Sequence, residues 1–139
     1  MNDEMAGLVL ISHGNFAPEA LKSAEMIMGH QEKVRTLSVI PGMDLNETVR
    51  VLEEAVSEVK GSRGVIILTD IPGGTPSNAA GILTASAEDV LALSGFNMPM
   101  LLEVLTSRNV SLSDIAAEVC SSGRHSIVNL TDSVKNSLK

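Results

Sequence analysis

The 139-residue sequence predicts an α/β fold: an open, mostly parallel, doubly wound sheet with helices on both faces. Short β-branched runs alternate with longer stretches of helical period, which is the pattern of strands joined by crossover helices. Two of the runs are apolar throughout, as in strands that helices cover on both faces. The chain is long enough to bury roughly two thirds of its unfolded surface without a disulfide or metal, so residues 1–139 are expected to form one domain.

Four runs are expected to be strands: Gly7–Ile11, Val34–Val39, Val65–Leu68 and Val90–Leu93. The first and third are the uniformly apolar runs, so they should be central, and we take the strand order to be 2-1-3-4. The run Ser126–Leu130 near the C-terminus is a candidate short fifth strand.

Helices are expected between and after these strands. From Ala17 to Met28 and from Leu45 to Val59, apolar residues recur on one helical face. A third helix should begin at Thr75–Pro76 and run to about Ala85, since Thr is a good N-cap and Pro suits the first helical position. Two more are expected, from Pro99 to Leu105 and from Ser113 to about Ser121.

Composition excludes several classes of function. The formal net charge is −7 and the only aromatic residues are two phenylalanines, so the chain repels phosphate backbones and lacks base-stacking platforms; nucleic acid is not an expected partner. The N-terminal residues are acidic where a signal peptide is basic, and no apolar run approaches the ~18 to 20 residues of a membrane span. A cytoplasmic protein without membrane insertion is expected.

Ligands of such sheets bind beyond the carboxyl ends of the strands, where neighbouring crossovers leave on opposite faces. The loops after the first and third strands carry the chemically versatile side chains there, His13 and Asp70. In the order 2-1-3-4 these strands are neighbours about 4.8 Å apart, so the two side chains face each other. In a Rossmann order, His13 would instead neighbour Ser94.

A carboxylate that accepts from one imidazole nitrogen sets the tautomer and leaves the other nitrogen as a nucleophile. His13 is therefore the candidate covalent nucleophile and Asp70 the residue that orients it. The glycine turn before Thr75 leads into a helix N-terminus, whose free N–H groups and dipole favour a phosphoryl group. The expected phosphoryl-binding residues are Gly14, Gly73, Gly74 and Thr75.

A structural interpretation stands beside this one, in which the His–Asp pair only holds the fold and the turn only begins a helix. Three features meeting at one end of the sheet favour a functional site. No G-x-x-x-x-G-K-[ST] is present, so these glycines are not a nucleotide cradle of the P-loop type.

Other residues are assigned no catalytic role. His30 is expected to face solvent beyond the first helix, His125 to lie in a turn, and Cys120 to be a small core residue. The histidines and the cysteine are well separated, so neither a metal nor another cofactor is expected. Arg108 is assigned either a helix-capping or a phosphate-related role.

Six groups of residues spaced along nearly the whole chain carry a family resemblance. They are Ser12-His13-Gly14, Ala24-Glu25-Met26 with Gly29, Pro41-Gly42, Asp70-x-x-Gly73-Gly74-Thr75-Pro76-x-Asn78-Ala79-Ala80, Gly95-Phe96-Asn97-Met98-Pro99-Met100, and Arg108. With these motifs at these spacings, the sequence resembles the IIA components of the mannose/sorbose family of the bacterial phosphoenolpyruvate-dependent sugar phosphotransferase system (PTS).

The resemblance implies a phosphocarrier. His13 would accept a phosphoryl group from the phosphorylated carrier protein HPr and pass it to a IIB component, which phosphorylates sugar entering through membrane IIC and IID partners. Asp70 would hydrogen-bond the other ring nitrogen, and Thr75 with nearby amides would contact the phosphoryl group; ATP and metal are not required. Family members are homodimers in which the terminal strand pairs with the partner's sheet, and Ile127–Leu130 is the matching segment.

The chain departs from the family pattern mainly on the partner surface, since Ile71, Pro72 and Ser77 stand where many relatives carry aromatic residues. Apolar residues on the expected active face either form a docking rim for two partners or are half-buried loop residues. They are Phe16, Met43, Pro72 and Met98.

Two other functions stay open. One is the phosphoryl-donor subunit of a dihydroxyacetone kinase, whose IIA-like domain also carries a strand-end histidine but resembles this chain less. The other is a regulatory module in which phosphorylation of His13 sets affinity for a regulator or kinase. The sequence does not indicate which sugar is transported.

Overall fold

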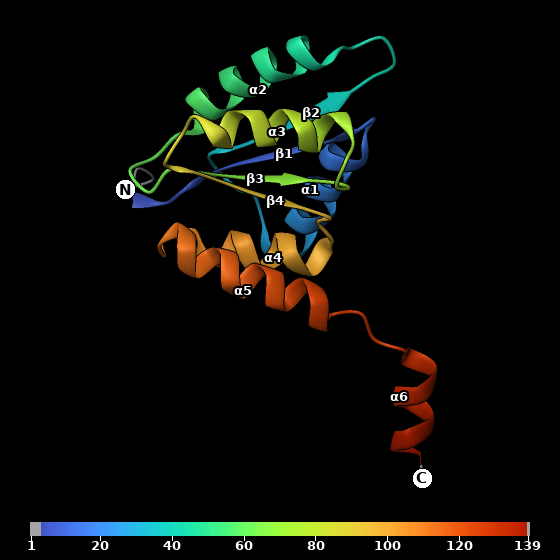
Figure 1. Cartoon of the computed structure of the whole chain (residues 1–139). Coiled ribbons are helices and arrows are strands. Elements are labelled where there is room, and N and C mark those ends of the chain that lie inside the picture. Colours follow the sequence, from blue (N-terminus) through green and yellow to red (C-terminus); the bar gives the residue numbers. More distant parts are fainter. Residues whose placement is uncertain (1–3, 139) are drawn as a thin grey trace.

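The structure, a computed structural model, describes residues 4–138; the first residues of the acidic N-terminal segment lie outside this range. Strands and helices alternate along most of the chain (Figure 1). In order they are β1 (Gly7–His13), α1 (Phe16–Met28), β2 (Val34–Val39), α2 (Leu45–Val59), β3 (Val65–Thr69), α3 (Thr75–Ala85), β4 (Val90–Ser94), α4 (Met98–Ser107), α5 (Leu112–His125) and α6 (Leu130–Ser137).

The strands form one parallel sheet in the order β2-β1-β3-β4, which confirms the expected order. Ile11 of β1 lies opposite Leu37 of β2 on one side and Thr69 of β3 on the other. Pairing with β2 continues to the end of β1, because His13 lies opposite Val39. His13 is thus the last residue of a strand rather than a loop residue, and the sheet limits the movement of its backbone.

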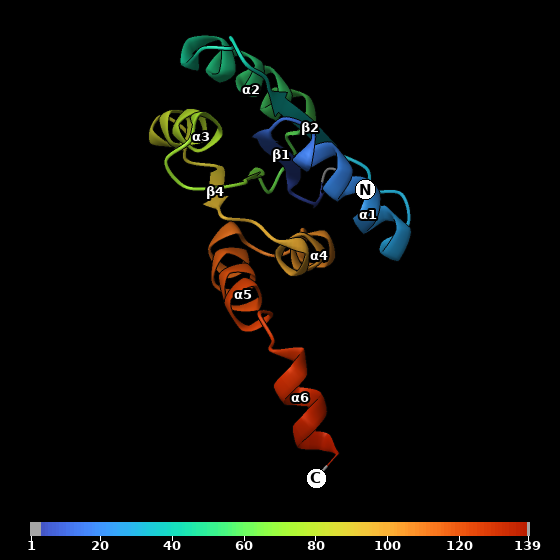
Figure 2. The same ribbon diagram turned by 90° about the vertical axis from the view of Figure 1, so that its right-hand side faces the viewer.

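Side chains of the two central strands alternate between two hydrophobic layers. Leu8, Leu10, Ile66 and Leu68 pack under α1, α4 and α5, and their neighbours in sequence pack under α2 and α3. Figure 2 shows α2 and α3 on one side of the sheet and α4 and α5 on the other. Each fully buried Leu or Ile contributes roughly 1.5–3 kcal/mol, so the apolar runs that predict these strands also provide much of the core.

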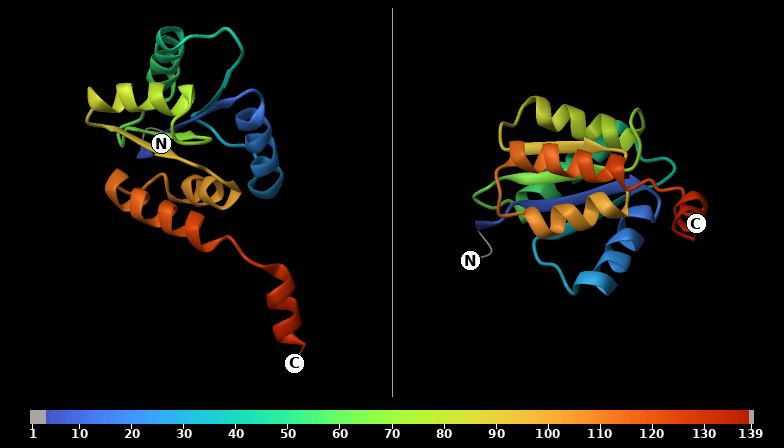
Figure 3. Two further views of the ribbon diagram at one scale, coloured as in Figure 1. Left: turned by 45° about the vertical axis from the view of Figure 1, so that its right-hand side comes forward. Right: turned by 90° about the horizontal axis from the view of Figure 1, so that it is seen from below.

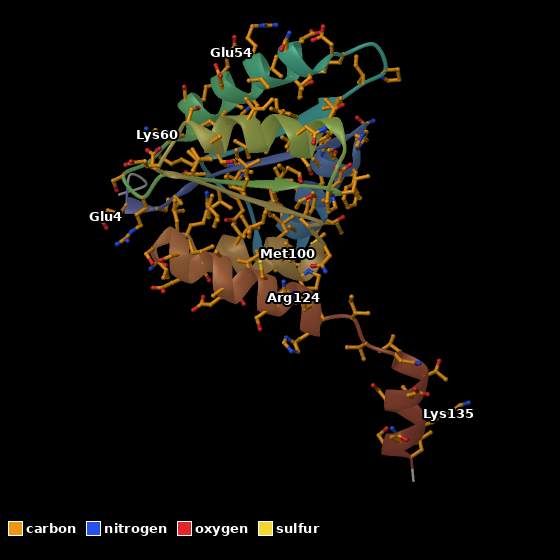
Figure 4. All side chains as sticks on the ribbon, in the orientation of Figure 1. Glu4, Glu54, Lys60, Met100, Arg124 and Lys135 are labelled. Atoms are coloured by element: carbon orange, nitrogen blue, oxygen red, sulfur yellow. The ribbon has the colours of Figure 1, made fainter. Side chains whose placement is uncertain are left out.

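Helices α2 and α3 have the expected bounds, whereas α1, α4 and α5 extend beyond them. Gly74, not Thr75, is the N-cap of α3, and Pro76 occupies the second helical position. The Asn97 side chain caps α4 by accepting a hydrogen bond from the Met100 amide at 3.0 Å. Met100 then packs against Gly123 of α5, between the two helices (Figure 4). Helix α5 continues to His125, so the turn expected around that residue is wrong.

The expected fifth strand is absent from the described residues. Residues 126–129 have no regular structure, and α6 follows them, extending away from the sheet (Figures 1 and 3). The Asn129 side chain begins α6 by accepting a hydrogen bond from the Asp132 amide at 3.1 Å. A β-branched run forms a strand only where another strand pairs with it, and within one chain the projecting segment meets none.

Among residues 4–138, no helix combines the length and the apolar composition that crossing a bilayer requires.

Candidate active site

The carboxyl ends of β1 and β3 bring His13 and Asp70 together. His13 Nδ1 lies 2.7 Å from Asp70 Oδ2, and the His13 backbone N–H donates to the same oxygen at 2.9 Å. The other carboxylate oxygen accepts from the Ile71 amide at 2.9 Å. The geometry therefore brings this predicted pair into contact and holds the carboxylate in one orientation.

Asp70 is the more buried member of the pair, with 11% of its side chain exposed against 50% for His13. Burial by itself raises the pKa of the Asp70 carboxyl, but the hydrogen bonds from the His13 amide, the His13 ring and the Ile71 amide outweigh it and hold the pKa below its ordinary value of 3.8. At neutral pH the ionised Asp70 carboxylate accepts a hydrogen bond from the Nδ1–H group of His13. The neutral imidazole then carries its proton on Nδ1, and Nε2 presents a free electron pair.

Helix α3 begins directly beside that free nitrogen. A Cβ atom at Gly74 would lie 2.6 Å from His13 Cε1 and 3.2 Å from Nε2. Only glycine therefore allows the helix to start so close to the ring, although its backbone is extended and suits any residue (φ −89°, ψ 173°). No side chain caps α3, so amides of its first turn stay available next to Nε2. Such a helix terminus favours an anion.

An open pocket of about 450 Å³ borders His13 on the β2 side. Its lining residues come from the ends of β1 and β2 and from the start of α3: His13, Gly14, Val39, Ile40, Pro41, Gly42, Met43 and Thr75. Thr75 thus lines the same pocket as His13, and its contact with a phosphoryl group stays a prediction. A phosphoryl group on Nε2 would be reachable from solvent and from the α3 N-terminus.

Two glycines turn the chain at the rim. Gly14 has φ +56° and Gly73 has φ +84°, conformations that other residues rarely adopt. The Gly14 amide donates to the Val39 carbonyl at 2.9 Å, so the bonding between β1 and β2 continues into the start of this turn. Contact of Gly14 and Gly73 with a phosphoryl group stays a prediction.

The four residues expected to dock partners differ in exposure. Phe16 is 49% exposed and stacks on Phe96, with ring centroids 4.9 Å apart. Pro72 is exposed, whereas Met43 and Met98 are both partly buried and each packs against one of the two core layers; Met43 also lines the pocket. Two of the four, Phe16 and Pro72, are therefore exposed, and the two methionines are half-buried.

Hydroxyl groups around the site were missed by sequence reasoning. Buried Ser12 accepts a hydrogen bond from the Ala17 amide at 2.7 Å and so replaces a side-chain cap at the start of α1. Ser77 bonds the Ile71 carbonyl behind Asp70. A serine directly before a strand-end histidine is a signal that could have indicated the role of Ser12. Nothing near Ser77 in the sequence indicates its bond to Ile71.

The residues given no catalytic role lie away from this pair. Arg108 is 4% exposed and donates to the carbonyls of Ala6 and Lys33, which precede β1 and β2. That position is at the opposite end of the sheet, so its role is structural and the phosphate-related alternative is wrong. His30 is exposed beside Glu25, and Cys120 is only partly buried, so its assignment to the core holds in part.

Among residues 4–138, no three His, Cys, Asp or Glu side chains cluster in a way that could hold a metal ion.

Comparison with known proteins adds an independent line of evidence. The family model described as "PTS system fructose IIA component" matches residues 7–120. The mannose-specific EIIAB component of Escherichia coli (strain K12) is 31% identical over 122 residues, which cover 86% of this chain but only 38% of that protein. The fructose-specific EIIA component of Bacillus subtilis (strain 168) is 33% identical over 113 residues, covering 80% of this chain and 77% of that protein.

Solved structures agree with these matches. The PTS IIA protein associated with the fucose utilization operon from Streptococcus pneumoniae has a TM-score of 0.83 and 32% identity, over 94% of this chain and 96% of that one. The phosphotransferase system component EIIA from Streptococcus agalactiae has a TM-score of 0.84 and 33% identity, over 92% and 99% of the two chains. The fold is thus that of known IIA components.

Proposed function

This chain belongs to the family of PTS fructose IIA components, the mannose-type IIA components of the sugar phosphotransferase system, and on that premise we propose that His13 is its phosphoryl carrier. His13 accepts a phosphoryl group from phosphorylated HPr in the cytoplasm and passes it to a IIB component. The IIB component in turn serves sugar that enters through IIC and IID membrane partners.

One observation carries this proposal: the 2.7 Å contact between His13 Nδ1 and Asp70, with Nε2 left beside the first turn of α3. The Nε2 electron pair attacks phosphorus as the bond from phosphorus to the donor breaks. The Nδ1 proton stays in its hydrogen bond to Asp70, whose negative charge stabilises the positive ring that forms. Transfer to IIB reverses these steps and returns the ring to its neutral form.

Amides at the start of α3 and the Thr75 hydroxyl donate hydrogen bonds that stabilise the negative charge on the phosphoryl oxygens during transfer. These donors are held by the helix before the group arrives, so little reorganisation is needed during transfer. The half-exposed ring keeps the phosphoryl group within reach of two different partner proteins in turn.

Partner proteins would dock over the same end of the sheet. Phe16, Met43 and Pro72 offer apolar area around His13, and a methionine adapts to more than one surface. The net charge of −7 favours steering by a basic docking face on HPr.

The proposed assembly is a homodimer in which Ile127–Leu130 pairs with the partner's sheet. In the single chain residues 127–129 have no regular structure and Leu130 begins α6, so this pairing would unwind the start of that helix. Two observations support it. Ile127, Val128 and Leu130 are 83%, 55% and 71% exposed in the single chain. In addition, β2 and β4 are the edges of the sheet, and an open edge can accept another strand.

Phosphorylation in vitro tests the proposal. The chain is incubated with phosphoenolpyruvate, enzyme I and HPr, and intact mass and acid lability report the product. We expect one acid-labile phosphate that depends on HPr and is absent in His13→Ala. His30→Ala is the matched control, because His30 is an exposed histidine outside the site, and it should label normally.

Onward transfer separates the proposed relay from the alternatives. Rapid loss of the phosphate to a IIB component supports the relay, whereas transfer only to a dihydroxyacetone kinase subunit, or a long-lived phosphohistidine without an acceptor, contradicts it. Equal labelling of wild type and His13→Ala would remove His13 as the carrier.

A further inference from the structure

Three hydroxyl groups from three elements meet behind the Asp70 loop. Ser77 Oγ of α3 lies 2.6 Å from Thr69 Oγ1 at the end of β3 and 2.7 Å from Ser94 Oγ at the end of β4. The same Ser77 hydroxyl donates to the backbone carbonyl of Ile71. We call Thr69, Ser77 and Ser94 the hydroxyl cluster.

The number of protons sets the direction of each bond in the cluster. Ser77 has one hydroxyl proton, which the Ile71 carbonyl accepts, and two lone pairs. Thr69 and Ser94 must therefore both donate to Ser77. All three protons are used, and the bond that leaves the cluster for the protein backbone is the one to Ile71.

Both backbone groups of Ile71 are consequently held. Its N–H donates to Asp70 Oδ1 at 2.9 Å, and its C=O accepts from Ser77. The second Asp70 oxygen holds the His13 ring and amide. Hydrogen bonds thus link Ser77 to the Ile71 carbonyl and the Ile71 amide to Asp70 and His13, and the step between the two Ile71 groups is covalent, through its Cα.

The bond from Ser77 to Ile71 also closes the glycine turn. The chain between them contains Gly73 and Gly74, which lose more conformational freedom on ordering than other residues do. A cross-link between residues 71 and 77 restricts this turn and sets where α3 begins relative to the His13 ring.

We infer that Ser77 is a positioning residue for phosphoryl transfer: its hydroxyl holds the Ile71 peptide and, through it, the Asp70 carboxylate that selects the His13 tautomer. This inference rests on the proposed function of His13. Ser77 itself touches neither the ring nor the phosphoryl group; it acts through Ile71.

The test compares Ser77→Ala with Ser77→Thr, which keeps the hydroxyl, and with Ser86→Ala. Ser86 is the matched control, because its hydroxyl also donates to a backbone carbonyl (Leu83, 3.2 Å) but lies at the far end of α3. We expect kcat for phosphoryl acceptance from HPr to fall about tenfold in Ser77→Ala, with KM for HPr within about twofold. Ser77→Thr should restore kcat, and Ser86→Ala should match wild type.

Nitrogen-15 NMR of the imidazole gives a readout that needs no phosphoryl donor. In wild type the neutral His13 ring should carry its proton on Nδ1, and in Ser77→Ala the two tautomers should mix. If Ser77→Ala does not fold, Ser77→Cys, of similar size but with a weak donor, replaces it in both measurements.

The outcomes separate the two proposals. Unchanged kcat and an unchanged tautomer in Ser77→Ala, or a loss confined to KM, would overturn the role of Ser77. Failure of wild type to accept phosphate would overturn the proposed function of His13, while the NMR comparison would still decide whether Ser77 orients Asp70.

Discussion

Replacing Gly74 with alanine tests whether close packing of α3 on the His13 ring is required for phosphoryl transfer. The added Cβ would lie 2.6 Å from His13 Cε1, against an optimal carbon separation of about 3.5–4.0 Å. The ring or the helix terminus must therefore move by about 1 Å. The Gly74 backbone is in the extended region, so the contact with the ring, not backbone strain, is the cause.

The magnitude follows from what that movement breaks. A shift of about 1 Å separates Nε2 from the amides of α3 or lengthens the 2.7 Å bond to Asp70, and misplacement on this scale costs on the order of 10²-fold in rate. The free energy of unfolding should fall by only about 1 kcal/mol, the low end for overpacking, because the half-exposed ring can move toward solvent.

Initial rates of phosphorylation by HPr and urea denaturation measure the two effects. Gly81→Ala is the control, since Gly81 lies in the same helix and a Cβ there meets nothing within 4 Å. It should keep the wild-type rate and match or exceed wild-type stability by up to about 1 kcal/mol. The destabilisation by Gly74→Ala should vanish in a His13→Ala background. A wild-type rate in Gly74→Ala would refute the reasoning.

Three more predictions follow from the same geometry. Asp70→Asn should slow phosphorylation of His13 on the order of 10³-fold, because an amide no longer selects the Nδ1–H tautomer; rates within about threefold of wild type would contradict this. Because the folded-state pKa of Asp70 is lowered, its ionised form stabilises the fold above pH 3.8, and this contribution is lost as pH falls through the lower folded-state value. The free energy of unfolding in urea should therefore differ between wild type and Asp70→Asn at pH 7, and the difference should shrink in acid. Arg108→Ala should destabilise by about 1–3 kcal/mol, because it removes a buried side chain and its hydrogen bonds to the Ala6 and Lys33 carbonyls. Phosphorylation of the folded variant should be unchanged, and a rate loss at full folding would place Arg108 in the site after all.

The strands could be predicted from sequence because their signal is local. Val65–Leu68 is apolar at every position and short, which is typical of a strand covered on both faces, and all four residues are buried. The pair His13 and Asp70 followed from the positions of two residues at strand ends, once strands one and three were taken as neighbours. The position of α3 was predicted almost to the residue by Thr75–Pro76, which favour a helix start whatever surrounds them.

The C-terminal segment shows where local signals mislead. Ile127 and Val128 favour a strand, but pairing energy comes from a neighbouring strand, and Asn129 offers a helix cap that needs no neighbour. Lys135 on α6 accordingly lies far from the sheet (Figure 4).

The sequence by itself determined the α/β architecture, the central strands and the two residues that carry the proposed chemistry, since each depends on patterns a few residues long. Only the tertiary structure decided that Gly74 presses against the His13 ring and that Ser77 reaches Ile71 behind Asp70. Those contacts depend on how α3 is set against β1 and β3, to within a few tenths of an ångström. Close packing of side chains from distant parts of the chain sets distances of that size, and no spacing along the sequence encodes them.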